Sequence, residues 1–470
     1  MTLYNTLARH VLAPSLDRMR GTSTMKCLAE LEESQWWPRE RIEELQAERL
    51  RNLVRHAFEN VPYYRRIMQE RGLGPGDIKS ASDLARLPIL TKEDIRTNDR
   101  DLMAIDFRVS KLRAMATSGS MGEPLHFYGT REEQFTRGLA RTLRALQWAG
   151  IEMGDRYALI GRPRHYHRRK DRLLHKLSLR FKREVEMDTG TLSQETLPLL
   201  VRRMQTAPIR ALLGPPPVLA LMAGHMKEHN IRVPHIRAVV SGGEQLLDHD
   251  RALLREVFET EPFSKYGSFE AYDIASECEA HAGLHVQSED IVVEIVAYDG
   301  THLPPGMMGR ILITNLHSFG MPFIRYEIGD LGSLDPTPCM CGRELPRLVG
   351  MVGRMSELIV TRSGRRVFGA DLCLEPLETF GVRQYRLAQE DVDSVDVYLV
   401  WSRDVTEVQR AERSGQIAAI LAGNIGDGVR VQVHTLDDIK PTAGGKHLFI
   451  VSKVAARGVR AGQAQQEERA

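Results

Sequence analysis

Ala238-Val239-Val240-Ser241-Gly242-Gly243 is a short apolar run that ends in two glycines, and it decides the fold class. Two similar runs precede it, Tyr157-Ala158-Leu159-Ile160-Gly161 and Ala211-Leu212-Leu213-Gly214. Stretches with helical periodicity separate the three runs. Strands that alternate with helices are typical of a mostly parallel sheet covered on both faces, with working loops at the strand ends. The sequence therefore predicts an α/β fold.

Helix and strand patterns continue on both sides of these runs. Residues 38–72 and 132–150 show helical periodicity. Thr91, followed by acidic residues, is typical of a helix N-cap. Further along the chain, strands are predicted at 292–296, 309–315 and 323–326.

A smaller α+β unit is predicted after Gly353-Arg354. Its strands are expected at 385–388, 395–400 and 429–433, and its helix at 405–422. We therefore expect a large domain over residues 1–352 and a small mobile domain over 353–456. Residues 457–470 hold almost nothing apolar to bury and are predicted to be disordered.

The composition limits the classes of function. The 470 residues include 64 Lys or Arg and 62 Asp or Glu, and the net charge of +2 argues against a nucleic-acid binder. No apolar run reaches the roughly 18 residues that a transmembrane segment needs. Residues 1–16 lack the apolar centre of an export signal. We expect a cytoplasmic protein that binds no nucleic acid.

Thr117-Ser118-Gly119-Ser120-Met121-Gly122-Glu123-Pro124 concentrates glycines and hydroxyls just before a strand-like run at 125–128. Because its side chains are small, its backbone N–H groups can turn toward an anion while Ser and Thr hydroxyls add donors. Such a loop is suited to binding phosphates. Taken alone, a Ser- and Gly-rich stretch is more often an ordinary connection.

Two later motifs supply carboxylates. Tyr266-Gly267-Ser268-Phe269-Glu270 places an aromatic ring, a tight turn and a carboxylate just after a predicted strand. Glu270 is a candidate Mg²⁺ ligand, because Mg²⁺ takes one or two carboxylates together with phosphate oxygens. In Arg325-Tyr326-Glu327-Ile328-Gly329-Asp330, the Asp330 carboxylate could accept hydrogen bonds from two ribose hydroxyls. An exposed Glu at a strand end and an ordinary turn Asp are the alternatives.

Lys446 lies in Pro441-Thr442-Ala443-Gly444-Gly445-Lys446-His447, near the end of the small domain. The segment is not a Walker P-loop, because Lys440 stands where the first glycine is needed and His447 where Ser or Thr would bind Mg²⁺. A surface lysine is the ordinary interpretation. A lysine on a flexible loop of a movable domain is also suited to stabilise charge on a phosphate or carboxylate.

In this order and spacing, the motifs resemble the adenylate-forming superfamily, closest to its phenylacetate-CoA ligase-like branch, which includes capsular-polysaccharide-type relatives. The resemblance covers residues from about 40 to 455. Each match is modest, whereas the joint order is specific. The matching segments are 60–65, 117–124, Ser241-Gly242-Gly243-Glu244, 266–270, 325–330, Gly353-Arg354 and Lys446.

The resemblance implies an activity and a set of site residues. Such enzymes activate a carboxylic acid with ATP as an acyl-AMP, release pyrophosphate, and pass the acyl group to a thiol, commonly coenzyme A. The implied catalytic residues are Lys446, at the reacting phosphorus and carboxylate, and Glu270, which binds Mg²⁺. The small domain would rotate near Glu357 and withdraw Lys446. The implied ATP-binding residues are Thr117, Ser118, Gly119, Ser120 and Gly122 at the phosphates, Gly243, Glu244 and Tyr266 at the adenine, Gly267 in the same motif, and Asp330 and Arg354 at the ribose.

Two positions depart from the family pattern. Related phosphate loops often carry Lys before the Pro, and Glu123 reverses that charge. Glu123 either points away from the nucleotide, leaves phosphate binding to the backbone, or weakens ATP use. Phe269 replaces the Thr or Ser that is common before the acidic residue, which is a milder change because the carboxylate is kept.

The cysteines form a second constellation. Cys278-Glu279-Ala280-His281 and Cys339-Met340-Cys341 offer three thiols and one imidazole, a set suited to a closed tetrahedral Zn²⁺ site. We take Cys278, His281, Cys339 and Cys341 as the ligands, with His285 as the substitute for His281. The resembling branch carries such a structural metal. Reduced cysteines without a metal are the alternative.

Residues 162–183 hold ten Lys or Arg and one Asp. Such a run is usually a solvated face, and it could also meet coenzyme A phosphates, an acidic carrier protein or a membrane surface. Two other functions stay open. One is an adenylating enzyme that passes its acyl group to an amine or a carrier-protein thiol. The other, motivated by Glu123, is a non-catalytic nucleotide-binding relative. The identity of the acid is open as well. The oligomeric state is also open, and a homodimer is one candidate.

Overall fold

The computed structural model describes most of the chain. The described residues are 2–108, 111–116, 125–161, 179, 183–188, 196–352, 358–363, 366–368, 372, 377, 380–402, 404–426, 428–440 and 450–454.

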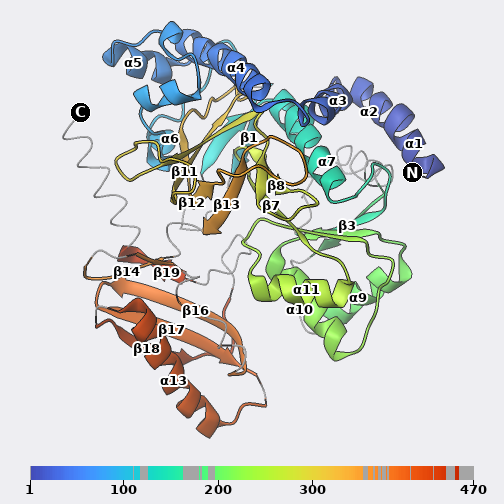
Figure 1. Cartoon of the computed structure of the whole chain (residues 1–470), viewed down its shortest axis with the longest axis vertical. Coiled ribbons are helices and arrows are strands. Elements are labelled where there is room, and N and C mark those ends of the chain that lie inside the picture. The colour runs from blue at the N-terminus through green and yellow to red at the C-terminus, as the bar shows by residue number, and fades with distance from the viewer. Residues whose placement is uncertain are drawn as a thin grey trace.

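An eleven-stranded sheet forms the centre of the molecule, in the order β10-β11-β12-β13-β9-β8-β7-β6-β5-β3-β4 (Figure 1). The strands from β4 to β7 in this order run parallel, and every pair from β7 to β10 is antiparallel. The bounds are β3 (Tyr157–Gly161), β4 (Glu184–Asp188), β5 (Ala211–Gly214), β6 (Ala238–Gly242), β7 (Phe263–Ser268), β8 (Tyr272–Glu277), β9 (Leu284–Val286), β10 (Ile291–Val296), β11 (Gly309–Asn315), β12 (Tyr326–Leu334) and β13 (Arg347–Val352).

The three apolar runs of the sequence are β3, β5 and β6, and they are neighbours in the sheet. Parallel neighbours need crossover connections, which the helices α9 (Leu197–Thr206), α10 (Pro216–Glu228) and α11 (Asp248–Phe258) provide. On α10, buried Leu219, Met222 and Met226 recur at helical spacing and pack in the core beneath these strands. The predicted α/β fold is therefore confirmed. The expectation of a mostly parallel sheet is wrong, because every strand pair from β7 to β10 is antiparallel.

Two helices cover the antiparallel half of the sheet, α4 (Arg39–Asn60) and α5 (Pro62–Glu70). The sequence predicts one helix over 38–72, and the structure breaks it at Pro62. Proline has no N–H to donate and disfavours helical geometry in the residue before it, and Val61 accordingly adopts an extended φ of −115°. The buried face of α4, with Leu50, Leu53 and Ala57, then packs in the same core as strands β10 to β12.

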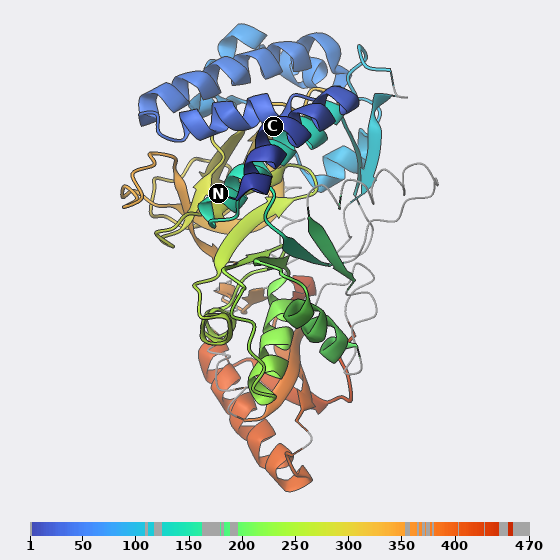
Figure 2. The same cartoon turned by 90° about the vertical axis from the view of Figure 1, so that its right-hand side faces the viewer.

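A separate four-stranded sheet lies toward the C-terminus, in the order β18-β17-β16-β19. Helix α13 (Glu407–Ile425) packs against it and begins at Thr406, whose hydroxyl accepts from the Gln409 N–H in a capping box. Figures 1 and 2 place this unit at the end of the molecule farthest from α4 and α5. The small α+β unit of the prediction is confirmed. Its strands are β16 (Val382–Asp391), β17 (Ser394–Trp401), β18 (Arg430–Thr435) and β19 (Ile450–Ser452).

The other elements lie mostly before β3. They are α1 (Leu3–Leu7), η1 (Ala8–Leu12), α2 (Ala13–Arg20), α3 (Thr24–Ser34), η2 (Pro75–Asp77), η3 (Ala81–Arg86), α6 (Lys92–Thr97), β1 (Arg113–Ala116), β2 (His126–Gly129), η5 (Glu133–Gly138), α7 (Leu139–Trp148), β14 (Leu358–Val360) and β15 (Arg366–Phe368). Among the described residues, no helix combines the length and the apolar character that crossing a bilayer requires.

Candidate active site and metal centre

Two tyrosines each donate a hydrogen bond to one of the two carboxylates that the sequence singles out. The Tyr266 hydroxyl, on β7, donates to Asp330 Oδ2 on β12 at 2.7 Å. The Tyr326 hydroxyl, on β12, donates to Glu270 Oε1 just beyond β7 at 2.8 Å. Each strand therefore holds the carboxylate of the other. Glu270 and Asp330 are both half-buried.

The turn between β7 and β8 positions Glu270. A Cβ on Gly267 would lie 2.3 Å from the Tyr272 carbonyl oxygen, so only glycine allows the two strands to approach this closely. Tyr272 takes a left-handed φ of 59° to close the turn. Gly267 thus has a conformational role, in addition to the ligand contact that the resemblance implies for its motif.

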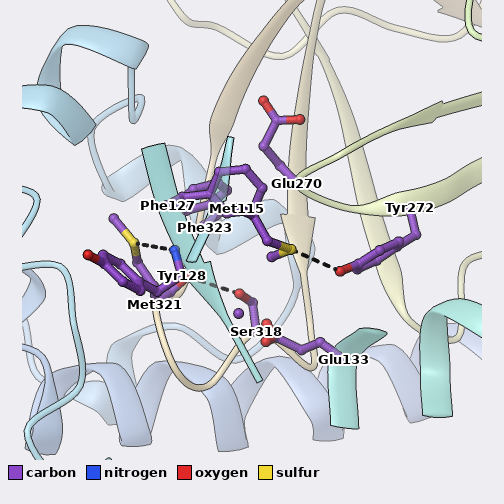
Figure 3. Close-up of a pocket in the computed structure, with 10 residues that line it drawn as sticks. Met115, Phe127, Tyr128, Glu133, Glu270, Tyr272, Ser318, Met321 and Phe323 are labelled. Carbon is purple, nitrogen blue, oxygen red and sulfur yellow. Dashed lines mark hydrogen bonds between the residues drawn. The ribbon is translucent and has the colours of Figure 1, made fainter. Parts of the chain in front are cut away.

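The strands on either side of the predicted phosphate loop reach the same region. Met115 of β1 and Phe127 of β2 line a pocket of about 220 Å³, counted with the open space at its mouth, together with Glu270 (Figure 3). The Tyr272 hydroxyl lies 3.3 Å from the Met115 sulfur. Phe127 packs on Phe323, 5.7 Å between ring centroids. The strands β1 and β2, which flank the loop in sequence, therefore lie beside Glu270.

Glu133 is a buried acid at one end of this pocket, beside Ser318 in Figure 3. Burial raises the pKa of its carboxyl to about 7, although hydrogen bonds from Ser318 and Thr130 act in the opposite direction. Glu133 begins the π-helical segment η5, a geometry that is frequent at functional sites. No local sequence pattern marks Glu133, because its burial depends on the packing of β2 and η5.

Gly243 and Glu244 directly follow β6, next to β7 in the sheet. Gly243 has a φ of 92°, which favours glycine and turns the chain away from the strand. This location beyond a parallel strand is where α/β sheets commonly bind ligands. The adenine role of both residues stays a prediction.

Several predicted residues lie outside the described part of the chain. This holds for Lys446, for Arg354, for the hinge at Glu357, for the tail 457–470 and for most of the basic stretch 162–183. Arg183, the last residue of that stretch, lies 3.8 Å from the centroid of the Tyr4 ring. The phosphate-loop residues outside the described part are Thr117, Ser118, Gly119, Ser120, Gly122 and Glu123.

A second site gathers Cys278, His285, Cys339 and Cys341, whose ligand atoms all lie within 4.8 Å of one another. The Sγ atoms of Cys278 and Cys339 are 3.7 Å apart. Zn–S bonds of about 2.3 Å at tetrahedral angles separate two sulfurs by about 3.8 Å. The four groups therefore fit a zinc ion.

The protonation of these groups also suits a metal. Burial lowers the pKa of His285 to about 4, so the imidazole is neutral near pH 7. Its Nδ1 lies 2.8 Å from the Leu345 carbonyl oxygen, and Nε2 lies 3.3 Å from Cys341 Sγ. An Nδ1–H donor leaves the Nε2 lone pair for a metal. Burial raises the pKa of Cys278 to about 12, and a bound cation is what would deprotonate such a thiol.

His281 is not in this cluster, which corrects our preferred ligand. Its Nδ1 lies 3.2 Å from Glu277 Oε2 and its ring packs on Phe263, 4.4 Å between centroids. His285, the substitute, lies on β9, which pairs with both β8 and β13 and so faces the sulfurs from both loops. The feature that distinguishes His285 from His281 as the fourth member of the cluster is that His285 lies within a strand rather than a turn.

No family model matches the chain. The phenylacetate-coenzyme A ligase of Thermus thermophilus is 28% identical over 335 residues, which cover 69% of this chain and 73% of that protein. The enzyme of the same name from Pseudomonas putida is 25% identical over 423 residues, covering 85% of this chain and 91% of that protein.

Solved structures share the fold. A crystal structure of 2-hydroxyisobutyryl-CoA ligase, in complex with R3-HIB-AMP, matches with a TM-score of 0.73 at 19% identity, covering 92% of this chain and 94% of that chain. ATP-bound MatB from Rhodopseudomonas palustris matches with a TM-score of 0.52 at 17% identity, covering 76% and 69%. In sequence the chain is therefore similar to phenylacetate-coenzyme A ligases, and it shares its fold, a mixed sheet with a separate C-terminal unit, with 2-hydroxyisobutyryl-CoA ligase.

Proposed function

We propose that this protein is an acid–thiol ligase that uses ATP to convert a carboxylic acid to an acyl-AMP and then transfers the acyl group to coenzyme A. The observation that carries the proposal is the crossed pair of hydrogen bonds, Tyr266 to Asp330 and Tyr326 to Glu270, on a fold shared with such ligases. Phenylacetate-coenzyme A ligases among the relatives support the same chemistry.

The two steps balance as follows. A carboxylate oxygen of the acid bonds to the α-phosphorus of ATP, and the bond from that phosphorus to the pyrophosphate oxygen breaks. The thiol sulfur then bonds to the acyl carbon, AMP leaves, and the thiol proton passes to solvent. Both partners of the first step are anions, so the protein must offset negative charge with preorganised cationic groups.

We assign the site residues on the basis of their motifs and placement. Glu270 would hold Mg²⁺, which supplies charge neutralisation at the phosphates when bound. Asp330 would accept the ribose hydroxyls, and Tyr266, with Gly243 and Glu244, would lie at the adenine. The remaining roles rest on sequence alone and go to Arg354 at the ribose, Lys446 at the reacting phosphorus, and Thr117, Ser118, Gly119, Ser120 and Gly122 at the outer phosphates.

The cysteine cluster is proposed as a structural zinc site, held by Cys278, His285, Cys339 and Cys341. All four positions are taken by protein ligands, as in closed structural sites, and no coordination position is left for a substrate. We assign this ion to stability rather than to the reaction.

The test is a pyrophosphate-release screen across aryl, fatty and amino acids, with and without coenzyme A. We expect release that depends on one class of acid and a thioester and AMP once coenzyme A is added. Release followed by transfer only to an amine or to a carrier-protein thiol would redirect the second step. Nucleotide binding without release for any acid would favour a non-catalytic relative, the alternative that Glu123 motivates. The homodimer remains a prediction for a mass measurement in solution.

Lys446→Ala tests whether Lys446 takes part in the adenylation step. Removing one group that stabilises charge in the transition state costs about 3–4 kcal/mol, or roughly a hundredfold to a thousandfold in rate. We expect acid-dependent pyrophosphate exchange to fall by that amount. Exchange at the wild-type rate would remove Lys446 from the site.

A further inference from the structure

We infer that Tyr326 is a positioning residue for the divalent cation, because its hydroxyl fixes the Glu270 carboxylate in a single orientation. The inference rests on the proposed function of Glu270 as the Mg²⁺ ligand. In this role Tyr326 would touch neither the cation nor the nucleotide. It acts through Glu270, to which it donates at 2.8 Å.

Tyr326 is well suited to act as a rigid support. Its side chain is completely buried, and its ring packs on Phe323 with centroids 5.0 Å apart. The backbone on both sides is clamped to Leu90, whose N–H donates to the Arg325 carbonyl at 3.0 Å and whose carbonyl accepts from the Glu327 N–H at 2.9 Å. The phenol therefore reaches Glu270 from a fixed origin.

Arg325 strengthens this clamp from the preceding position. Its φ of 55° is left-handed, a conformation that a non-glycine residue adopts only when surrounding contacts enforce it. The buried guanidinium donates to Glu294 Oε1 at 3.0 Å and to the Leu87 carbonyl at 2.7 Å. These contacts hold the start of β12.

Glu270 needs such a support because of where it lies. It stands in the turn after β7, next to Phe269, whose side chain is 59% exposed. A half-buried carboxylate in a turn would otherwise sample several rotamers. Tyr326 occupies Oε1, which leaves Oε2 for a cation, and Mg²⁺ demands near-ideal octahedral geometry. Groups behind a metal ligand that fix its orientation commonly change metal affinity ten- to a hundredfold.

The chain supplies a matched control in Tyr266. Its hydroxyl makes the corresponding hydrogen bond to Asp330, which is assigned to the ribose and not to the cation. Tyr326→Phe and Tyr266→Phe each remove one oxygen and keep the ring. The structure predicts a different defect for each variant.

The experiment measures cation and nucleotide affinity separately in the full-length protein. Mn²⁺ binding is followed by electron paramagnetic resonance with a non-hydrolysable ATP analogue present, and nucleotide binding is titrated at saturating Mg²⁺. We expect Tyr326→Phe to weaken Mn²⁺ binding about tenfold, with nucleotide affinity at saturating Mg²⁺ changed less than twofold. We expect the reverse pattern for Tyr266→Phe. In turnover assays, Tyr326→Phe should raise the Mg²⁺ concentration for half-maximal rate by a similar factor.

Glu270→Gln completes the test and guards against a folding defect. If Tyr326 acts through Glu270, adding Tyr326→Phe to Glu270→Gln should cause no further loss of Mn²⁺ affinity. Unchanged Mn²⁺ binding in Tyr326→Phe, or an equal additional loss in the Glu270→Gln background, would overturn the inference. If the wild-type protein binds Mn²⁺ and nucleotide but releases no pyrophosphate with any acid, the proposed function fails while the Mn²⁺ titrations still decide the role of Tyr326.

Discussion

Glu133 shows how burial of one side chain makes stability depend on pH. The pKa of its carboxyl is about 7, above its ordinary value of 4.5. The folded state therefore binds more protons than the unfolded state between these values, and the free energy of unfolding falls as the pH rises through them. A shift of this size corresponds to about 3 kcal/mol.

Glu133→Gln removes this titration. We expect the variant to be more stable than the wild type at pH 8.5, by up to about 3 kcal/mol, and to lose that advantage near pH 4.5. Urea unfolding at both pH values measures the difference. Glu132→Gln, at the exposed neighbouring position, should show no such crossover. Parallel pH profiles of Glu133→Gln and wild type would contradict the raised pKa.

Asp290 has the opposite effect on how the free energy of unfolding depends on pH. It is completely buried, and the surrounding cations hold the pKa of its carboxyl well below the usual range despite the cost of burial. Of the groups that lower it, His317, whose Nε2 lies 2.9 Å from Oδ1, contributes most, followed by Arg141 and Arg137. Arg49 donates to the same carboxylate at 2.7 Å. The ionised form is stabilised, so this contribution is present above about pH 4 and is lost as the pH falls.

Asp290→Asn should be strongly destabilising, because it leaves several buried cations without their counter-charge. Removing one partner of a buried ion pair typically costs about 3–5 kcal/mol. Denaturant unfolding at pH 7 measures the loss, with the exposed Asp437→Asn as the control. A loss below about 1 kcal/mol would mean that the cluster is hydrated rather than dry.

Among the elements, the turn between β7 and β8 is the most constrained. Gly267→Ala would place a methyl group 2.3 Å from the Tyr272 carbonyl, and the strands would have to separate. We expect a loss of about 1–3 kcal/mol in stability and weaker cation binding through displacement of Glu270. In contrast, Gly224→Ala in α10 meets no atom within 4 Å and should stabilise the protein by about 0.5–1 kcal/mol. Thermal unfolding of both variants shows whether Gly267→Ala lowers and Gly224→Ala raises the melting temperature.

Element types were predictable where one local signal dominated. The strands β3, β5 and β6 followed from apolar runs, and α13 from its helical periodicity. Strands β8, β9 and β13 were not predicted, because their residues mix polar and apolar types. β12 was expected to include Phe323 and begins at Tyr326, since Arg325 takes a left-handed φ that long-range contacts impose.

At the scale of the whole molecule, the cluster of Cys278, His285, Cys339 and Cys341 joins segments that are far apart in the sequence. Cys278 follows β8, and Cys339 and Cys341 lie between β12 and β13. Because a structural zinc site contributes directly to folding, its loss should loosen this part of the antiparallel sheet.

We expect one zinc ion per chain in freshly purified protein. Cys339→Ser should abolish zinc binding and lower the melting temperature, and a chelator should reproduce that change in the wild type. Cys27→Ala, at a buried cysteine outside the cluster, should keep its zinc. Elemental analysis decides the question, and a wild-type protein free of zinc would leave the cluster as four reduced or neutral side chains.

The site was predictable only as far as motifs reach. Glu270, Tyr266 and Asp330 came from short patterns, and the structure joins them through hydrogen bonds. The support from Tyr326, the burial of Glu133 and the replacement of His281 by His285 all depend on contacts between distant segments. No local pattern encodes such contacts, because strand order and the packing of β9 between β8 and β13 are properties of the complete sheet.

The change of strand direction at β7 has a consequence for how a bound nucleotide would be detected. With the proposed ribose role of Asp330, a bound nucleotide would touch the last parallel strand, β7, and also β12 in the antiparallel half. Amide hydrogen exchange should therefore slow in two segments that are far apart in the sequence, one around residues 263–273 and the other around 323–334. Protection confined to one of the two segments would indicate that the ligand contacts only the parallel half or only the antiparallel half of the sheet.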